Sequence, residues 1–407
     1  SKKEILVNQP IYLDNAATTY PKPPSVYTEA DRFYRRDGGN AGRGGNPMAR
    51  ACARLLAETR ALLATWLHAP APETVLFTSS ATHALNLAIF GAHLRSHDTI
   101  YVTPFEHNSV LRPIEQLRQT KGIQVRQIPF SRHTYTCQFD KLKAAFQSQP
   151  PAMVCVTQAS NVCGVMPPVE QIAQLAKAIN PQAIIIVDGA QTAGLYPLPL
   201  DRGLIDAFIF SGHKSLYGPY GIAGLVLATK WRPAPLFFGG TGTISERVQM
   251  PTNLPSAYEA GSHNIWAVAG LKAALEWLIQ TGRDAIVEQT MNLAHELRSE
   301  LDMLPNIDLY APPIESGRGG VLRQAQEPGA RGRWCGILSF TVEYTQPQAI
   351  EAALGAQDIA VRAGLHCAPW VHEWMGTLER GGTVRVSTGY FNNAAEVGQL
   401  SDFISMM

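Results

Sequence analysis

The sequence lacks a charge excess and lacks long apolar runs. Its 407 residues include 34 Lys and Arg against 33 Asp and Glu, a formal net charge of +1. This balance gives no electrostatic basis for binding nucleic acid or an acidic membrane surface. No stretch reaches the roughly 18 consecutive apolar residues of a membrane-spanning helix. The first residues also lack the apolar run of a secretory signal, so we expect a cytoplasmic protein.

Paired cysteines and glycine-rich nucleotide motifs are also missing. None of the six cysteines forms a C-x-x-C pair, which excludes a disulfide scaffold and a zinc ribbon and favours reduced thiols. No GxxxxGK[ST] or GxGxxG motif follows an apolar strand, which argues against a P-loop or a Rossmann site. Hydrophobic residues make up 45% and charged residues 16% of the chain, which is typical of a well-buried globular core.

Apolar segments of strand length alternate with helical patterns through the first two thirds of the chain. We identify seven such strands, at 74–80, 99–107, 123–130, 152–161, 183–191, 207–214 and 222–229. Buried strands separated by helices predict an α/β fold with a mainly parallel seven-stranded sheet.

The expected domains follow from changes in this pattern. Residues 1–20 form an N-terminal arm that packs on the small domain and the active site, and residues 21–265 form the large domain. Residues 266–407 form a smaller α+β domain. The Gly-, Arg- and Gln-rich segment 315–334 is expected to be a flexible insertion.

Polar residues gather at or just after the ends of five predicted strands. They are Thr82, His107, Asn161, Asp188, Gln191, Ser211, His213 and Lys214. Ligands bind at the carboxyl ends of the strands in open α/β sheets, so these residues outline a candidate site.

Two of these residues predict a cofactor. Lys214 follows an apolar strand and is a candidate Schiff-base amine, although most lysines are solvated surface residues. Asp188 ends the apolar run "AIIIVD", where a carboxylate needs a cationic partner or a ligand. Asp188 alone could be a helix cap or a metal ligand. A lysine together with an aspartate for a pyridinium nitrogen is the pyridoxal phosphate signature.

Other residues extend this hypothesis. Thr82 lies in a loop of small residues before a helix, where a phosphate or an ordinary N-cap is expected. His107 could stack on a planar cofactor and shuttle protons, or it could be structural. Arg385 and Arg362 could each clamp a substrate carboxylate or hold a structural ion pair.

The segment "RAGLHCAPW" (362–370) contains Cys367, which could be a disulfide half, a metal ligand, a buried residue or a nucleophile. No cysteine pairing supports a disulfide. His366 and His372 are nearby, but no further cluster of metal ligands supports a metal site.

The motifs taken together carry a family resemblance. The segments "YLDNAATTYPKP", "EHNSVLRP", "ASNVCG", "VDGAQ", "SGHKSLYGPYG", "EAGSHN" and "VRAGLHCAP" occur in this order from about residue 11 to the end. This set resembles the cysteine desulfurases of the class V aminotransferase family, which are fold type I pyridoxal phosphate enzymes. "RAGLHCA" is similar to the loop of the group II branch, the SUF-type and selenocysteine lyase-like enzymes.

The resemblance implies a role for each matched residue. Lys214 would bind the cofactor covalently, Asp188 would pair with the pyridinium nitrogen, Gln191 with the ring hydroxyl, and His107 would stack on the ring. The phosphate would be held by Ala81, Thr82, Ser211 and His213, with Ser262 reaching the phosphate of a second subunit in a homodimer. Asn161 and Arg385 would bind the carboxylate of L-cysteine, and Cys367 would accept its sulfur. A sulfur-acceptor protein, often one for iron–sulfur cluster assembly, would then take the sulfur.

The implied nucleophile needs nearby positive charge, because the thiolate is the reactive form of cysteine. Arg362 and His366 are the candidates. The chain departs from the branch pattern at Ala81, Ser262, Leu365 and Ser215. These departures leave cofactor binding intact and leave substrate preference open.

Three alternative functions remain. The first is a selenocysteine lyase or cyst(e)ine C–S lyase on the same fold. The second is a transaminase or epimerase of the same fold type, against which Cys367 argues. The third, from another class, is a non-catalytic binding or scaffold protein with a decayed site.

Overall fold

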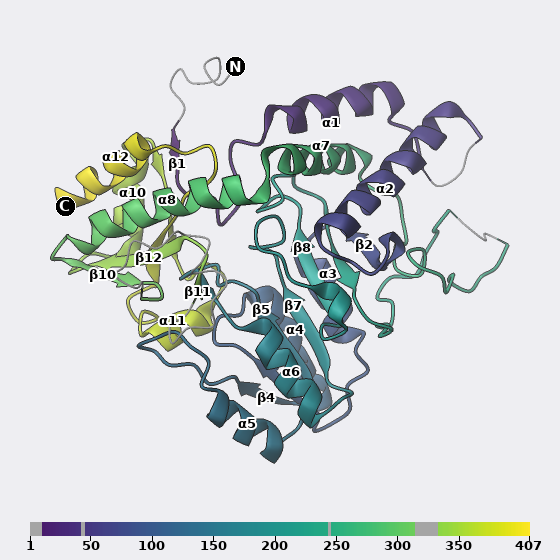
Figure 1. Cartoon of the computed structure of the whole chain (residues 1–407), viewed down its shortest axis with the longest axis horizontal. Coiled ribbons are helices and arrows are strands. Elements are labelled where there is room, and N and C mark those ends of the chain that lie inside the picture. Colours follow the sequence, from purple (N-terminus) through teal and green to yellow (C-terminus); the bar gives the residue numbers. More distant parts are fainter. Residues whose placement is uncertain (1–9, 42–44, 243–245, 314–332) are drawn as a thin grey trace.

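The computed structural model describes residues 10–41, 45–242, 246–313 and 333–407. At its centre lies the predicted seven-stranded sheet (Figure 1). In spatial order the strands are β2 (Val75–Thr78), β9 (Ala223–Leu227), β8 (Ala207–Ser211), β7 (Ile184–Asp188), β5 (Pro151–Thr157), β3 (Thr99–Val102) and β4 (Gln124–Gln127).

The sheet is mainly parallel, as the sequence predicts. Strands β4, β3, β5, β7 and β8 run parallel, whereas β9 is antiparallel to both β8 and β2. Parallel neighbours need a crossover connection, and no helix separates β8 from β9. The expected α/β fold with a mainly parallel sheet is therefore confirmed.

Helices cover both faces of the sheet, because the strand side chains alternate between two cores. Ile186 and Ile209 pack into the core that contains residues of α3 (Ala81–Phe90) and α4 (Asn108–Lys121). Val187 and Phe208 pack into the other core. The helices contributing to that second core include α2 (Pro47–Trp66), α5 (Phe139–Ser148), α6 (Val169–Ile179) and α7 (Ile265–Thr281).

Helix α7 corrects the predicted domain boundary. The sequence interpretation assigned residues from 266 onward to the small domain. In the structure, α7 packs against α1 (Pro24–Asp37) and α2, and Leu271 and Leu275 are buried in the core of the large sheet. The expected boundary at 265 therefore cuts off a helix that packs with the large domain. An amphipathic pattern shows that a helix buries one face, but not which domain that face meets.

The smaller α+β domain follows α7. Its four-stranded antiparallel sheet has the order β10 (Ile307–Tyr310), β12 (Ile337–Val342), β15 (Thr383–Ser387) and β14 (Arg362–Gly364). Its core takes residues from α8 (Arg283–Asp302), α10 (Pro347–Gly355) and α12 (Ala394–Ser405). Figure 1 shows this domain beside the large sheet. Helix α11 (Pro369–Met375) instead buries Val371 and Trp374 in the large-domain core.

The N-terminal segment connects the two domains. Strand β1 (Ile11–Tyr12) pairs in parallel with β13 (Ile359–Ala360), and Asp14 forms a β-bridge with Ser387. Further along, Thr18 Oγ1 donates to the carbonyl of His213, 2.8 Å away. Residues 11–19 therefore contact the small domain at one end and the loop of Lys214 at the other.

The expected insertion at 315–334 lies almost entirely outside the described residues. Its last two residues form β11 (Arg333–Trp334), which pairs with β6 (Val165–Met166) of the large domain. Among the helices that the structure describes, none has the length and apolar character needed to cross a membrane.

Candidate active site

Lys214 and Asp188 lie at the carboxyl ends of neighbouring strands. Asp188 is the last residue of β7, is 6% exposed and accepts a hydrogen bond from Ala190 N at 3.0 Å. Lys214 follows β8 by three residues and lies within electrostatic range of Asp188. Burial lowers the pKa of Lys214 to about 8, and the Asp188 carboxylate opposes that fall. Burial likewise raises the pKa of Asp188, against the effects of Ala190 N–H and Lys214.

The backbone around Lys214 is held tightly. Ser215 Oγ accepts from Gly194 N at 3.1 Å, and a Cβ on Gly194 would lie 1.8 Å from the carbonyl oxygen of Ser215. The extra serine noted in the sequence is therefore a structural residue. Gln191, from the same turn as Gly194, donates through Nε2 to Ala16 O at 2.9 Å. The turn after β7 thus packs against the lysine loop through Gly194.

The start of α3 and the start of α4 meet beside these residues. Ser80 caps α3, so Ala81 and Thr82 begin the helix, and their N–H groups have no partner within it. Thr82 Oγ1 lies 2.8 Å from Ser109 Oγ in α4. Two helix N-termini with small hydroxyl residues therefore lie together, an arrangement that favours an anion.

His107 lies at the N-cap of α4, not on a strand. The predicted strand 99–107 ends at Val102, and residues 103–107 form a turn. The Nδ1 atom of His107 accepts from Ser109 N at 3.0 Å, which leaves the proton of the neutral ring on Nε2. Burial, and then the charge of Lys214, lower the pKa of His107 to about 4. The imidazole is therefore neutral at pH 7.

Ser211 and His213 flank the end of β8. Ser211 is 2% exposed. The His213 ring stacks on Tyr220 with centroids 4.4 Å apart, and its buried Nδ1 has no hydrogen-bond partner among the described residues. Burial and the charge of Lys214 lower the pKa of His213 to about 3, so this ring too is neutral.

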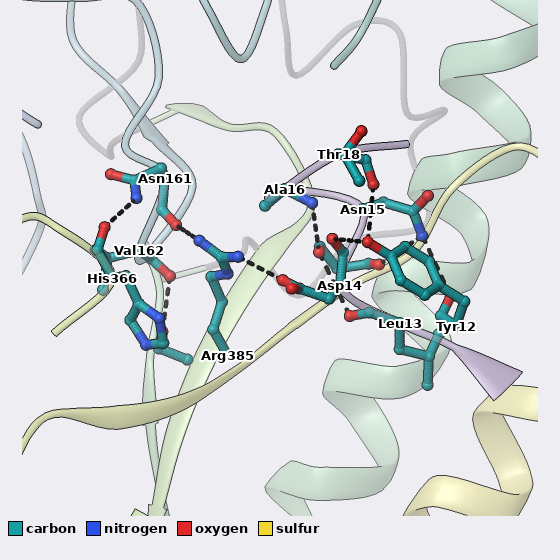
Figure 2. Close-up of polar contacts among 12 residues, drawn as sticks. Tyr12, Leu13, Asp14, Asn15, Ala16, Thr18, Asn161, Val162, His366 and Arg385 are labelled. Atoms are coloured by element: carbon teal, nitrogen blue, oxygen red, sulfur yellow. Dashed lines mark hydrogen bonds and ion pairs between the residues drawn. The ribbon is translucent and has the colours of Figure 1, made fainter. Parts of the chain in front are cut away.

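Arg385 lies at the centre of a polar chain that joins the two domains (Figure 2). It is 2% exposed in β15, and its Nη1 donates to Asn161 O at 2.9 Å. Its Nη2 pairs with Asp14 Oδ1, and its buried Nε has no partner among the described residues. Asn161 in turn donates through Nδ2 to His366 O at 2.8 Å. The structure shows that Arg385 forms an ion pair with Asp14, and its role as a substrate clamp stays a prediction.

Cys367 lies on a short loop between β14 and α11. The loop is fixed to the large domain twice, because Asn108 N donates to Cys367 O at 2.7 Å and Asn161 Nδ2 donates to His366 O. Both His366 and Cys367 have left-handed φ angles, of 49° and 57°. The Cys367 side chain is exposed and its thiol is free. The bond to Asn108 places this thiol loop next to His107.

These features agree with comparisons to known proteins. A family model described as aminotransferase class V matches residues 11–400. The chain belongs to this family. It is 32% identical over 97% of its length to a probable cysteine desulfurase of Pyrococcus abyssi, and covers 94% of that protein. A probable cysteine desulfurase of Halalkalibacterium halodurans is 30% identical over 96% of this chain and 91% of its own length.

Solved structures of the family agree with this assignment. The apo structure of the cysteine desulfurase from Thermococcus onnurineus superposes with a TM-score of 0.84 at 27% identity, covering 98% of this chain and 94% of that one. The cysteine desulfurase CsdA from Escherichia coli gives 0.81 at 26% identity, with the same coverage. These similarities confirm the family that the sequence motifs indicate.

The environment of Cys367 differs from the expectation in one respect. His366 was one of two candidates for that positive charge, but it is 6% exposed and its Nε2 lies 3.1 Å from Thr383 O. Burial, followed by the charge of Arg385, lowers the pKa of His366 to about 2. The ring is neutral, so His366 supplies no positive charge beside the thiol. Arg362 is exposed on β14 and forms no ion pair within the described ranges.

Ser262 lies apart from the other predicted residues. It is exposed and lines an open surface cavity of about 910 Å³, between the start of α7 and the segment joining α1 to α2. The neighbouring loop is held by Glu259, which forms two 2.8 Å bonds to Arg60 and lies 2.9 Å from His263 Nε2.

Three residues near the site were missed at the sequence level. Asp14 contacts Arg385, Lys22 Nζ donates to His213 O at 2.6 Å, and Glu106 Oε1 accepts from Thr157 N at 2.8 Å. Glu106 could have been found from the sequence, because it lies just after the apolar strand β3, much as Asp188 ends β7. No three His, Cys, Asp or Glu residues gather to hold a metal ion in the part of the chain that the structure describes.

Proposed function

We propose that this family member is a pyridoxal phosphate-dependent cysteine desulfurase that converts L-cysteine to L-alanine and takes the sulfur on Cys367. The carrying observation is the position of the Cys367 loop. Its backbone is bonded to Asn108, one residue after His107, so the loop with the exposed thiol lies near the edge that carries Lys214 and Asp188. A transaminase has no use for a thiol at this place.

The residues at the sheet edge fit pyridoxal phosphate. Lys214 would hold the aldehyde carbon, Asp188 the pyridine nitrogen and Gln191 the ring hydroxyl, with His107 against the ring. The phosphate would bind the α3 N-terminus at Ala81 and Thr82, together with Ser211 and His213. The buried Nδ1 of His213, which has no partner among the described residues, supports this placement. When bound, the cofactor would supply an electron sink that weakens the C–S bond of the substrate.

The proton chemistry follows from the pKa values. A lysine with a pKa of about 8 is partly neutral near pH 7, so Lys214 Nζ can accept the proton on Cα of the substrate. Asp188 is buried one strand away and would stabilise a proton on the pyridine nitrogen of the bound cofactor. The neutral His107 ring carries its proton on Nε2 and adds no positive charge beside Lys214.

The sulfur step belongs to Cys367. Its thiolate attacks the substrate sulfur, an S–S bond forms and the Cβ–S bond breaks. The electron pair of the broken bond stays on carbon, which is then protonated to give alanine. Of the two candidates for positive charge beside the thiolate, His366 is neutral, which leaves Arg362. The substrate carboxylate would bind Arg385 and Asn161.

In this proposal the protein forms a homodimer. Exposed Ser262, at the rim of the 910 Å³ cavity, would reach the phosphate held by a second copy of the chain. The buried ion pair of Arg60 and Glu259 holds the loop that carries Ser262. The N-terminal arm and the small domain then enclose the substrate, and a sulfur-acceptor protein, such as one for iron–sulfur cluster assembly, would approach the exposed cysteine loop.

The test compares Cys367→Ala with Lys214→Ala. The Cys367 variant should keep the visible absorbance of the bound cofactor and form neither alanine nor a persulfide from L-cysteine. The Lys214 variant should lose both the absorbance and turnover. Cys137→Ala, at a half-buried cysteine, is the matched control and should behave as the wild type.

The outcomes separate the alternatives. Wild-type protein incubated with L-cysteine should gain the mass of one sulfur atom on the peptide containing Cys367. Alanine formation by the wild-type protein from selenocysteine but not from cysteine would identify a selenocysteine lyase instead. Full activity of Cys367→Ala on cysteine would contradict the nucleophile, and wild-type protein that never binds the cofactor would indicate a scaffold.

A further inference from the structure

The carboxylate of Asp14 forms an ion pair with Nη2 of the Arg385 guanidinium. Asp14 belongs to the N-terminal arm and Arg385 to β15, 371 residues later in the chain. Figure 2 shows the guanidinium between Asn161 on one side and Asp14 on the other. The pair is nearly dry, since the side chain of Arg385 is 2% exposed and that of Asp14 is 14% exposed.

Both partners are held by other contacts. Asp14 forms a backbone bridge with Ser387, and the adjacent Asn15 donates through Nδ2 to Ser387 O at 3.0 Å. Arg385 also donates to Asn161 O at 2.9 Å, so its guanidinium keeps one fixed contact without Asp14. Its Nε remains buried and without a partner among the described residues. An N–H edge of the guanidinium is therefore left for a further acceptor.

A buried guanidinium needs a counter-charge, because desolvation of an unpaired ion is costly. In the protein alone, Asp14 provides that counter-charge. An amino-acid substrate brings a second carboxylate to the same guanidinium. The two carboxylates then share one positive charge and repel each other, which weakens binding of the substrate.

We propose that Asp14 stands in for the substrate carboxylate and sets the affinity of Arg385 for carboxylate ligands. The inference rests on the proposed function, in which Arg385 binds the carboxylate of L-cysteine. Asp14 is a specificity-determining residue in this scheme. It stabilises the ligand-free site, and it keeps carboxylates, including the product L-alanine, from binding tightly.

The experiment uses the cofactor-loaded protein and three small ligands. Propionate carries a carboxylate without an amine, ethylamine carries an amine without a carboxylate, and L-alanine carries both. Dissociation constants are measured from the change in the visible spectrum and from the rise in Tm on titration. In Asp14→Asn, the Kd values of propionate and L-alanine should fall three- to tenfold, while the Kd of ethylamine stays unchanged.

Asp308→Asn is the matched control. Asp308 forms an exposed ion pair with Arg380 in which both side chains are more than half exposed, so its loss should change no Kd. Asp14→Glu keeps the charge and should bind propionate within twofold of the wild type. Asp14→Ser removes the charge while leaving room for water, and it replaces the asparagine variant if that variant does not fold.

Two results are decisive. A Kd for propionate that is unchanged or higher in both Asp14→Asn and Asp14→Ser overturns the role of Asp14. The Arg385→Met variant tests the proposed function separately. If it binds propionate as the wild type does, Arg385 is not the carboxylate site and both proposals fall. If it loses propionate binding, the Asp14 variants alone decide the inference.

Discussion

Replacing Lys22 with methionine should raise the Tm of the protein at neutral pH, and this gain should shrink as the pH rises. Lys22 is 9% exposed beneath the Lys214 loop. Its Nζ contacts three oxygens: Thr19 Oγ1 at 2.8 Å, His213 O at 2.6 Å and Thr18 Oγ1 at 3.3 Å. No carboxylate pairs with it among the described residues, and burial lowers its pKa to about 7.

The sign of this pH dependence follows from proton linkage. Between pH 7 and 10.5 the unfolded chain holds a proton on Lys22 that the folded protein has released. Stability therefore rises with pH across this window. The cost of burying the ammonium is fully present below pH 7 and is gone above pH 10.5. Methionine fills similar space without a charge, so the variant lacks this cost at every pH.

The magnitude follows from the same values. A pKa lowered from 10.5 to about 7 corresponds to at most about 5 kcal/mol, at about 1.4 kcal/mol per pH unit. The unfolding entropy of 407 residues is about 0.85 kcal/mol/K, from about 2.1 cal/mol/K per residue. The Tm of Lys22→Met should then exceed that of the wild type by at most about 6 °C at pH 7. The three oxygens stabilise the ammonium and make this an upper bound.

The assay is differential scanning fluorimetry of the cofactor-loaded wild type and variant at half-unit steps from pH 6 to 10. Lys230→Met, at an exposed lysine, is the control and should show no trend with pH relative to the wild type. A Tm difference that is independent of pH, or a variant less stable than the wild type at pH 7, would refute the reasoning. Either result would mean that hydrogen bonds to the three oxygens fully offset the desolvation of Lys22.

Two further predictions concern buried residues. Burial raises the pKa of Glu106 to about 8. The stability that Glu106 contributes is therefore fully present below pH 4.5 and is lost as the pH rises through 8. In Glu106→Gln, which keeps an acceptor for Thr157 N–H, the Tm measured against pH should lack this fall. Glu106→Leu removes that acceptor and should cost about 1–3 kcal/mol at pH 5 in urea unfolding. In the small domain, Leu354→Ala at a 0% exposed position should cost about 2–5 kcal/mol in the same assay, whereas Leu378→Ala at a 40% exposed position should cost less than about 0.5. An equal cost at both leucines would show that Leu354 is not a core residue.

Much of the site could be predicted because its chemistry lies in short motifs. Asp188 and Lys214 each follow an apolar strand, and parallel strands bring such positions to one edge. His107 was assigned to the end of a strand, whereas it caps α4. The turn after Val102 contains the apolar Phe105, so its sequence resembles the continuation of a strand. The substrate and phosphate roles stay predictions that the proposed experiments test.

Charge states could not be read from the sequence. His366 is adjacent to Cys367 in the chain and was, with Arg362, a candidate cation. Its ring is instead buried against Thr383, and burial lowers its pKa to about 2. Exposure and hydrogen-bond partners decide ionisation, and neither is a property of neighbouring residues in the chain.

The sequence by itself determined the layered sheet, the lysine and aspartate at its edge and the cysteine loop, because strand periodicity and motif spacing are local properties. Tertiary structure alone decided that α7 packs with the large domain and that Asp14 holds Arg385 across 371 residues. It also decided that Lys22 is buried against the Lys214 loop. These features depend on which surfaces exclude water from one another, and that is settled only when the domains pack together.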